Sequence, residues 1–392
     1  MNDLLEGLRI LDLGRYTAGP YCAKLFVDAG ADVIHVERPG AGDPARALPP
    51  LLDDGSGEAV SAVYAFLNAD KRSVTLDFTT PTGAEWLREL VRWADIVVEN
   101  FAPGTLERHG FGVDEMLGVN PTVVWVSITN FGGSGPSRDL RGTSLTLQAA
   151  AALMDGNGDE DREPLRYPRH LSEYWAGSNA AHAALIARRH ARLSGEGQHV
   201  DVSIQESLVA SYFMHFADYQ YQGALQARGW LDLKPASDGP IIVNWHTAVP
   251  WDVFAIALEA EELILDPELQ PPLSMTANAG RVADVISRSM RARTRREWFA
   301  RAKEHRVPAG MVQTLDEVAA CEHLEARAHF GSLRLPGGAE GRVPGPPYAL
   351  NEGATERTQA VPGLGEHNVV VFGELLGHSD GELQAAAAAG AI

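Results

Sequence analysis

The sequence is poor in the features that mark disulfide-stabilised, membrane-spanning or nucleic-acid-binding proteins. Cys22 and Cys321 are its two cysteines in 392 residues, too few for a disulfide framework or a cysteine zinc site. It contains no run of about 18 apolar residues, so we expect no membrane span. Lys and Arg number 33 against 52 Asp and Glu, a net charge of −19, which disfavours binding to nucleic acid or to an anionic membrane surface.

The composition is that of an ordinary globular protein, with 45% hydrophobic and 22% charged residues. The N-terminal stretch has neither a basic segment nor a cleavable apolar one, so we expect no secretory signal and a cytoplasmic location. The length favours two or three domains. We predict no metal site.

The first part of the chain alternates between strand-like and helical patterns. Its strand-like runs are separated by helical spacing and fall at residues 8–13, 31–36, 95–101 and 122–131. Apolar strands that alternate with helices are typical of a parallel sheet covered on both faces. We therefore predict an α/β protein whose large domain, residues 1–220, contains a Rossmann-like open sheet.

The remainder of the chain has a different pattern. Residues 203–221 have the spacing of one long helix, and residues 247–330 are mostly helical in pattern. We predict a smaller mixed, mostly helical domain over residues 221–330. Residues 331–392 are predicted to return to the large domain as a C-terminal segment.

The first predicted strand–turn–helix unit is the clearest candidate for a ligand site. Its turn runs from Gly14 to Pro20 and leads into a helix N-terminus, where exposed backbone N–H groups favour an anion. The second strand ends at Glu37, where a dinucleotide-binding fold places its ribose-binding acid, but G-x-G-x-x-G is absent and Arg38 follows. From these residues alone, a site for a phosphate-bearing ligand and a tight glycine turn without a ligand both stay open.

Several longer motifs follow one another across nearly the whole chain. They are GLRILDLGRYTAGPYCAKLFVDAGADVIHVERPGAGDPAR, NADKRSVTLDFTTPTG, DIVVENFAPGTLERHGFG, NPTVVWVSITNFGGSGP and SEYWAGSNAAHAALIARRHARLSGEGQHVDVSIQES, followed later in the chain by REWFARAKEHRVPAGMVQTLDEV and VPGLGEHNVVVFGELLG. In order and spacing they closely resemble the class III coenzyme A transferases, also called the carnitine-dehydratase/bile-acid-inducible family. The resemblance implies an interlocked homodimer that moves CoA from an acyl-CoA to a free carboxylic acid. It also implies no tightly bound cofactor, with CoA as substrate and product.

The resemblance further implies where CoA binds. A planar guanidinium pairs phosphate oxygens bidentately, so arginines suit the phosphates of CoA. The matching positions are Thr17 and Ala18 at the pantetheine arm, Asn100 and Phe101 beside the CoA, and Arg38, Arg108 and Arg141 as basic residues toward its phosphates. Thr79 and Ala102 stand where family members often carry a basic residue.

The nucleophile position departs from the family. Members carry an aspartate in a D-x-x-x-G motif, which attacks the acyl-CoA and passes through a mixed anhydride and an aspartyl-CoA thioester. This chain reads EYWAG there, beginning at Glu173. A glutamate carboxylate supports the same covalent chemistry, although a displacement of roughly 1 Å at the reacting atom can cost about 10²-fold in rate. The match predicts Glu173 as the nucleophile, while the residue type alone fits a helix N-terminus equally well.

Two other functions stay open at this stage. Because glutamate replaces aspartate, a CoA-thioester-binding protein without transfer activity is one alternative. An acyl-CoA racemase or isomerase on the same fold is the other. Related racemases carry a histidine in a G-H-D motif where this chain reads RGTS from Arg141, and racemisation needs two acid/base groups, so this alternative is disfavoured. His170, three residues before Glu173, is either a positioning group, a base or a structural residue.

Overall fold

The computed structural model describes residues 4–159, 161–223, 225, 233–245, 248–275, 277–349 and 358–392. They belong to two compact units. The larger unit comprises Met1–Asn157, Glu163–Arg228 and His323–Ile392, and the smaller one comprises Gly158–Arg162 and Gly229–Glu322.

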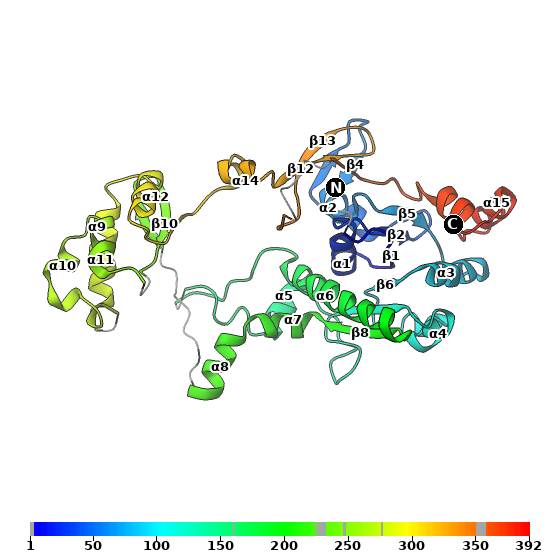
Figure 1. Cartoon of the computed structure of the whole chain (residues 1–392), viewed down its shortest axis with the longest axis horizontal. Helices are drawn as coiled ribbons and strands as arrows, with labels where there is room; N and C mark the ends of the chain where they lie inside the picture. The colour runs from blue at the N-terminus through cyan, green and yellow to red at the C-terminus, as the bar shows by residue number, and fades with distance from the viewer. Residues whose placement is uncertain are drawn as a thin grey trace. The chain divides into compact units, whose positions relative to one another are not determined.

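A six-stranded sheet forms the centre of the larger unit, in the order β5-β2-β1-β6-β7-β8 (Figure 1). All neighbouring strands in it run parallel. The strands are β1 (Arg9–Asp12), β2 (Asp32–Glu37), β5 (Arg72–Thr75), β6 (Ile96–Glu99), β7 (Val124–Thr129) and β8 (Gln198–Ser203). The parallel α/β sheet predicted from the alternating pattern is confirmed.

Both faces of this sheet are covered, because successive strand residues point to opposite sides. Ile96 and Val98 of β6 belong to one apolar core and Val97 to the other. The first core is shared with α1 (Ala18–Val27), α5 (Ser144–Ala150), α6 (Leu171–Ser194) and α7 (Ile204–Ser211). The second is shared with α3 (Pro81–Trp93), α4 (Val113–Val119), the π-helix η5 (Val369–Leu375) and α15 (Asp380–Ala388).

The larger unit also carries several short elements outside the six-stranded sheet. Helix α2 packs with η1 and with a small sheet in the order β13-β12-β14, around Tyr64 and Leu333. These elements are η1 (Pro44–Ala47), β3 (Leu51–Asp53), β4 (Ala59–Ser61), α2 (Ala62–Asn68), η2 (Glu107–His109), α14 (Glu322–Ala326), β12 (Phe330–Arg334), β13 (Glu340–Pro344) and β14 (Thr358–Ala360).

The long helix predicted over residues 203–221 is two helices in the structure. Helix α7 ends at Ser211, and α8 (Phe213–Gln222) begins after Tyr212. Tyr212 has φ −109° and ψ 27°, which interrupts the helical backbone. The apolar spacing of the segment is compatible with both arrangements, so the pattern could not reveal the break.

The smaller unit is mostly helical around a three-stranded antiparallel sheet in the order β11-β10-β9. Phe254, Leu263, Met290 and Trp298 lie in its core. Its elements are β9 (Leu233–Ala236), β10 (Gly239–Val243), α9 (Trp251–Ala257), α10 (Glu262–Leu265), η3 (Pro267–Leu269), η4 (Leu273–Met275), α11 (Ala279–Met290), α12 (Arg295–Glu304), β11 (Ala309–Met311) and α13 (Leu315–Ala319). Within the described part of the chain, every helix is too short or too polar to span a membrane.

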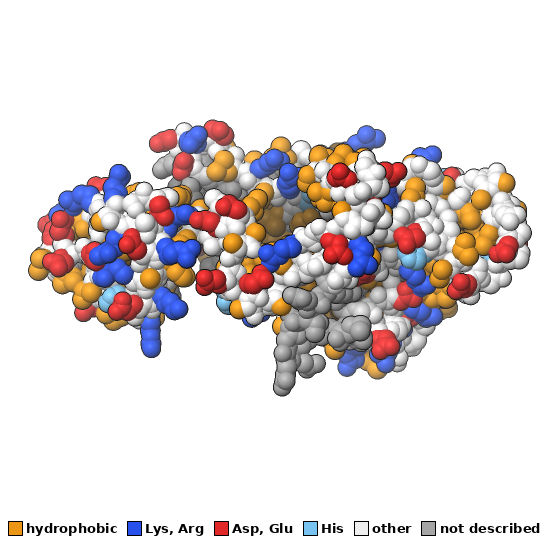
Figure 2. Space-filling view, turned by 90° about the horizontal axis from the view of Figure 1, so that it is seen from above, with side chains coloured by type: hydrophobic (Ala, Val, Ile, Leu, Met, Phe, Trp, Pro, Cys, Tyr) orange, Lys and Arg blue, Asp and Glu red, His pale blue; other side chains and the backbone are white. Residues whose placement is uncertain are grey.

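Acidic and basic side chains are interspersed on the face of the molecule that Figure 2 shows, with hydrophobic side chains between them. The net charge of −19 therefore coexists with cationic groups at many places on the surface. A site for an anionic ligand in this protein has to be a local arrangement of such cations, because the overall charge opposes it.

Candidate active site

The first βα turn, residues 14–17, joins β1 to α1 and is closed very tightly. A Cβ on Gly14 would lie 2.8 Å from Cα of Gly19, and one on Gly19 would lie 2.7 Å from Cα of Gly14. Tyr16 has φ +62°, a left-handed conformation that a bulky residue rarely adopts. The two glycines are thus required by the close approach, and Tyr16 needs support from its surroundings.

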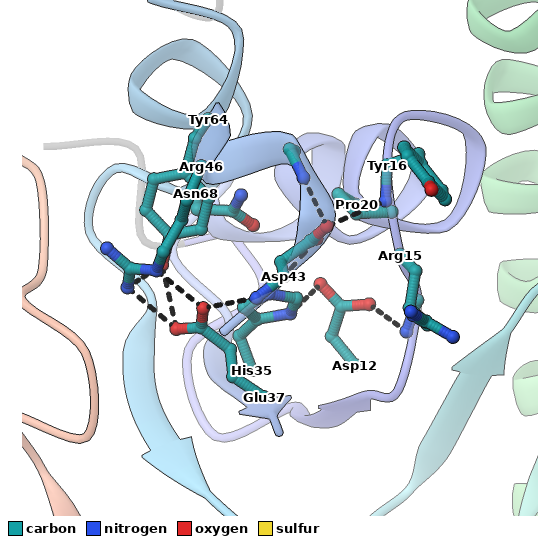
Figure 3. A network of polar contacts seen from close by, with 12 residues as sticks. Asp12, Arg15, Tyr16, Pro20, His35, Glu37, Asp43, Arg46, Tyr64 and Asn68 are labelled. Carbon is teal, nitrogen blue, oxygen red and sulfur yellow. Dashed lines mark hydrogen bonds and ion pairs between the residues drawn. The ribbon is translucent and has the colours of Figure 1, made fainter. Parts of the chain in front are cut away.

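Three side chains from separate segments bind consecutive backbone groups of this turn. The bonds run from Gly14 N to Asp12 Oδ1 (2.9 Å), from Arg15 N to Asn100 Oδ1 (2.7 Å) and from Tyr16 N to Asp43 Oδ1 (3.0 Å). Asn100 also donates to the Arg15 carbonyl (2.8 Å), so both ends of its amide hold the turn. Figure 3 shows Asp12 and Asp43 beside the segment that carries Arg15 and Tyr16.

A group of buried charges lies under the turn. Asp12, His35 and Lys71 are almost completely buried. Asp12 Oδ2 lies 3.0 Å from His35 Nδ1 and accepts from Lys71 Nζ at 2.8 Å, and Lys71 also donates to the carbonyl of Pro20. Burial alone would raise the pKa of Asp12, but the nearby Lys71 and His35 outweigh it and hold that pKa at about 2. Asp12 is therefore a carboxylate at neutral pH.

Glu37, at the end of β2, is used by the protein framework. Its carboxylate accepts from Arg46 Nε (2.6 Å), from the Tyr64 hydroxyl (3.0 Å) and from the Ser73 hydroxyl (2.7 Å). Burial opposes its ionisation, yet the Arg46 hydrogen bond and the other neighbours hold the pKa of Glu37 at about 2. With its oxygens engaged in this way, Glu37 is a structural residue and does not serve as a ribose-binding acid.

A pocket of about 340 Å³ opens beside the turn. Its lining includes two cationic side chains, Arg15 and Arg38, and an aromatic group formed by Phe78, Phe101 and His109. Phe78 meets Phe101 and His109 edge-on, with ring centroids 6.0 Å and 5.7 Å apart, and the Arg15 guanidinium lies 5.9 Å from the Phe101 ring. Aromatic surfaces beside guanidinium groups suit a ligand that combines a planar base with phosphates.

The predicted CoA-binding residues have different relations to this pocket. Arg38 and Phe101 line it, and Thr17 and Ala18 lie at the start of α1, where both are buried. Arg108 is exposed and donates to Thr105 Oγ1 (3.2 Å), a residue of the pocket rim. Arg141 is exposed in the described loop before α5 and is not one of the residues that line the pocket.

Sequence reasoning does not single out several residues of the site. Arg15, Phe78 and His109 lie within the motifs that carry the family resemblance. Their position in those motifs is the sequence feature that could have identified them as pocket residues. Asp12 and Asp43 also lie within the first of these motifs, but a single carboxylate at a strand end or in a loop usually faces solvent, so the residue type does not reveal their role.

Glu173 occupies the first turn of α6. Gly177, one helical turn later, lies on the same face of the helix and allows close packing on α1. A Cβ on Gly177 would lie 2.9 Å from the Ala18 carbonyl oxygen. Glu173 Oε2 is buried and has no hydrogen-bond partner in the described structure. The E-x-x-x-G motif thus sets a carboxylate that the framework does not use on the helix face that packs against α1.

The segment before Glu173 is fixed by a buried amide. Gln148 of α5 accepts from the backbone N–H of Tyr167 (2.8 Å) and donates to Ser172 Oγ (3.2 Å). The ring of His170, the residue before the helix, lies 6.4 Å from that of Tyr174. Gln148 therefore ties the segment before α6, and Ser172 in its first turn, to α5.

A second polar cluster is formed by Glu99 at the end of β6, Ser127 within β7 and His199 near the start of β8. Ser127 Oγ lies 3.0 Å from His199 Nε2, and Glu99 accepts from the backbone N–H of Phe101 (2.7 Å). Burial raises the pKa of Glu99 to about 7, although hydrogen bonds from Ser127 and Phe101 act against it. These residues line a separate cavity of about 140 Å³.

An open parallel sheet with a pocket at its first βα turn, lined by Arg15 and Arg38, by three aromatic rings and by the carboxylates of Glu37, Asp43 and Asp77, defines an α/β protein with a candidate ligand site at the carboxyl end of its strands. Residues 5–368 match the family described as CoA-transferase family III, and the chain belongs to it. It is an acyl-CoA:carboxylate CoA-transferase, as the sequence motifs predicted.

Individual relatives are similar over nearly their whole length. A succinyl-CoA–D-citramalate CoA-transferase of Chloroflexus aurantiacus is 30% identical, covering 97% of this chain and 96% of that protein. A succinate–glutarate CoA-transferase of Agrobacterium fabrum is 29% identical, with 95% of each chain covered. The crystal structure of a CAIB/BAIF family protein from Brucella suis superimposes with a TM-score of 0.85 at 28% identity, covering 96% of this chain and 100% of that one.

Proposed function

We propose that this enzyme transfers CoA through covalent intermediates on Glu173, with CoA bound along the first βα turn. The base and phosphates would occupy the pocket beside Arg15 and Arg38, and the pantetheine arm would pass Thr17 and Ala18 toward α6. The observation that carries this proposal is Oε2 of Glu173, which is buried without a hydrogen-bond partner among the described residues and lies on the helix face that packs against α1. Buried polar atoms are normally paired, so an unpaired one at a helix start is available to a substrate.

The chemistry balances without an external acid, base or cofactor. A Glu173 oxygen attacks the thioester carbonyl, the C–S bond breaks and CoA leaves as thiolate, which gives an acyl-glutamyl anhydride. The thiolate then attacks the Glu173 carbonyl and releases the donor acid. The acceptor carboxylate attacks this glutamyl-CoA thioester, its C–S bond breaks to release the thiolate, and a second anhydride joins the acceptor to Glu173. The thiolate then attacks the acceptor's acyl carbon in this anhydride, which forms the new acyl-CoA and frees the Glu173 carboxylate.

Glu173→Gln tests the assignment directly. The variant should keep CoA binding, because shape is retained, and lose transfer, because an amide does not attack as a carboxylate does. Wild-type protein incubated with acyl-CoA and then hydroxylamine should carry a hydroxamate on Glu173, detectable by peptide mass. Glu206→Gln, in the first turn of α7, is the matched control and should transfer normally. Full transfer by Glu173→Gln would refute the proposal.

Glu173→Asp asks whether the pocket is adapted to glutamate. Aspartate is one methylene shorter, so its oxygen would stop short of the position from which Glu173 attacks. We expect transfer to fall by about 10- to 100-fold while CoA affinity stays unchanged. An increase in the transfer rate would show instead that the site retains the geometry for aspartate.

For the substrates, we propose succinyl-CoA as donor and a small dicarboxylate as acceptor. The relatives described above are named for succinyl-CoA or succinate and for the dicarboxylates citramalate and glutarate. Transfer from succinyl-CoA to a panel of mono- and dicarboxylates, followed by chromatography of the CoA thioesters, tests this choice. Faster transfer to monocarboxylates would contradict it.

We further propose that the protein is a homodimer, interlocked as in the family that its motifs resemble. Support comes from α8, on which Phe213, Phe216, Tyr219 and Tyr221 are 53–87% exposed. Several exposed aromatic side chains on one short helix are typical of a surface that another chain covers. Light scattering coupled to size exclusion should give twice the mass of the 42.2 kDa chain, and a monomer would refute this assignment.

A further inference from the structure

His35 lies between the two carboxylates that hold the first βα turn. Its Nδ1 is 3.0 Å from Asp12 Oδ2, and its Nε2 is 3.6 Å from Asp43 Oδ2 (Figure 3). Both carboxylates turn their other oxygen, Oδ1, to the turn, where they accept the backbone N–H groups of Gly14 and Tyr16. One imidazole therefore connects two separate supports of the same turn.

The charges around His35 favour an imidazolium. Asp12 and Asp43 present two buried carboxylates, and Lys71 supplies one ammonium to Asp12. A protonated His35 supplies the second cation, so that two carboxylates face two cations. Burying a carboxylate without a balancing cation is costly in free energy. The titratable groups that face His35 from the surrounding elements are Asp12 of β1, Asp43 after β2, Glu37 of β2, Tyr64 of α2 and, through Asp12, Lys71 of the turn before β5. Burial alone would lower the pKa of His35, but Asp12, Asp43 and Glu37 raise it to about 9.

The contact between His35 and Asp43 depends on one pair of facing atoms. Nε2 of His35 and Oδ2 of Asp43 are both buried and have no partner within hydrogen-bonding distance in the described structure. At 3.6 Å the two atoms attract each other as charges, and a small movement would bring them into a hydrogen bond. Tyr16, which Asp43 supports, is in the left-handed region, so the turn depends on this contact more than an unstrained turn would.

We propose that His35 is a positioning residue for acyl-CoA, which holds the turn at residues 14–17 in its binding shape through Asp12 and Asp43. The inference rests on the proposed function, in which CoA lies along this turn. It assigns His35 no contact with the substrate and no part in the bond-making steps on Glu173. Its effect should therefore appear in the affinity for CoA and in the KM for acyl-CoA, with little change in kcat.

The test compares His35→Gln with the wild-type enzyme in two independent measurements. Hydrogen exchange of the peptide over residues 13–21, recorded without ligand, should be about tenfold faster in the variant. The Kd for CoA and the KM for succinyl-CoA should rise by about tenfold, as for the loss of one charged hydrogen bond, while kcat changes less than threefold. In wild type the KM should also rise as pH passes about 9, and His35→Gln should lack this rise.

His378→Gln is the matched control for a destabilising change elsewhere. His378 also binds a carboxylate, Glu89 Oε2 at 2.8 Å, and stacks on Trp86 in the core on the far face of the sheet from α1. It should lower stability without changing exchange of the turn or the Kd for CoA. Asp43→Asn is a second test, because its Oδ1 can still accept from Tyr16 while the charge facing His35 is lost. It should shift exchange and Kd in the same direction as His35→Gln.

The outcomes distinguish the role of His35 from the binding place of CoA. Unchanged exchange of residues 13–21 in both His35→Gln and Asp43→Asn would overturn the positioning role itself. Faster exchange with an unchanged Kd for CoA would show that His35 holds the turn but that CoA does not lie on it, which overturns the proposal together with its CoA-binding premise. Neither outcome affects the test of Glu173: loss of transfer with normal CoA binding in Glu173→Gln would still support Glu173 as the nucleophile.

Discussion

The first βα turn and the first turn of α6 supply the two ends of the candidate site, and they differ in how their polar groups are used. At the βα turn, Asp12 alone accepts from Gly14, His35 and Lys71. At α6, Glu173 leaves a buried oxygen without a partner in the described structure. A carboxylate whose two oxygens are both paired, such as Asp12, fixes one conformation, whereas the unpaired oxygen of Glu173 is available to a ligand at some cost in stability.

This difference separates stability from activity along the chain. Substitutions in the network under the βα turn should first change the free energy of unfolding and, through the turn, the affinity for CoA. Substitutions at Glu173 should change the transfer rate and leave the fold intact. Four measurements test whether the two regions differ in this way.

The largest effect is expected from Lys71→Met. The variant leaves Asp12 with one cationic neighbour fewer in a fully buried site, and removing one partner of a buried ion pair typically costs about 3–5 kcal/mol. Urea unfolding followed by circular dichroism should show this loss. Arg288→Met, which breaks an exposed pair with Glu262, should cost less than about 1 kcal/mol. Similar effects of the two variants would show that the buried network contributes no more than a surface ion pair.

A second effect should appear in the pH dependence of stability. The pKa of His35 is raised from 6.5 to about 9, so the folded state keeps a proton that the unfolded state releases. The contribution is complete below pH 6.5 and is lost as pH rises toward 9, by at most about 3 kcal/mol. Glu99, with its pKa raised to about 7, acts in the same direction between about pH 4.5 and 7. The low pKa of Asp12 and of Glu37 acts oppositely, and their contributions are lost as pH falls toward 2.

Urea unfolding at pH 6, 7, 8 and 9 measures this dependence. His35→Gln should flatten the decline above pH 6.5. It should also reduce the stability lost on the acid side, because His35 is one of the cations that lower the pKa of Asp12 and of Glu37. Equal slopes in the two proteins between pH 6.5 and 9 would mean that His35 does not carry the proton in the folded state.

Some features of these two regions can be predicted from the sequence, and others cannot. The alternation of β-branched runs with helices predicts the parallel sheet, and the glycines at 14 and 19 mark a tight turn. The EYWAG motif places Glu173 at a helix start, where the structure has it. Each of these features depends on a few neighbouring residues, so a local sequence pattern predicts it.

The buried network could not be predicted in this way. His35 and Lys71 lie 23 and 59 positions from Asp12 in the sequence, and they meet it because β1, β2 and β5 are neighbours in one sheet. A charged residue in or beside a strand usually faces solvent, so the residue types argue against burial until all partners are known. The pairing register, which sequence patterns do not provide, brings them together.

A third effect concerns the cations of the pocket. Arg38→Ala should weaken CoA binding by about 1.5–3 kcal/mol if the guanidinium binds a phosphate, and it should not affect stability, because the side chain is exposed. Arg108→Ala should have a smaller effect, because Arg108 reaches the pocket rim through Thr105. Calorimetric titration with CoA measures both. Unchanged affinity in both variants would remove the phosphate site from this pocket.

The smallest effect, and the one that bears most directly on the contrast, is the stability of Glu173→Gln. Two opposing contributions meet at this position. A negative charge in the first turn of a helix is stabilising by about 0.3–1 kcal/mol. A buried carboxylate oxygen without a partner costs about 1–3 kcal/mol, which outweighs that stabilisation. We therefore expect the free energy of unfolding of Glu173→Gln, measured with urea, to exceed that of wild type by up to about 1 kcal/mol.

Glu206→Gln is the control for this measurement. The exposed Glu206 side chain in α7 loses only its favourable interaction with the helix dipole, so this variant should become slightly less stable. If Glu173→Gln is less stable than Glu206→Gln, the Glu173 carboxylate supports the fold. The proposed difference between the hydrogen-bonded βα turn and an unpaired nucleophile on α6 would then be wrong.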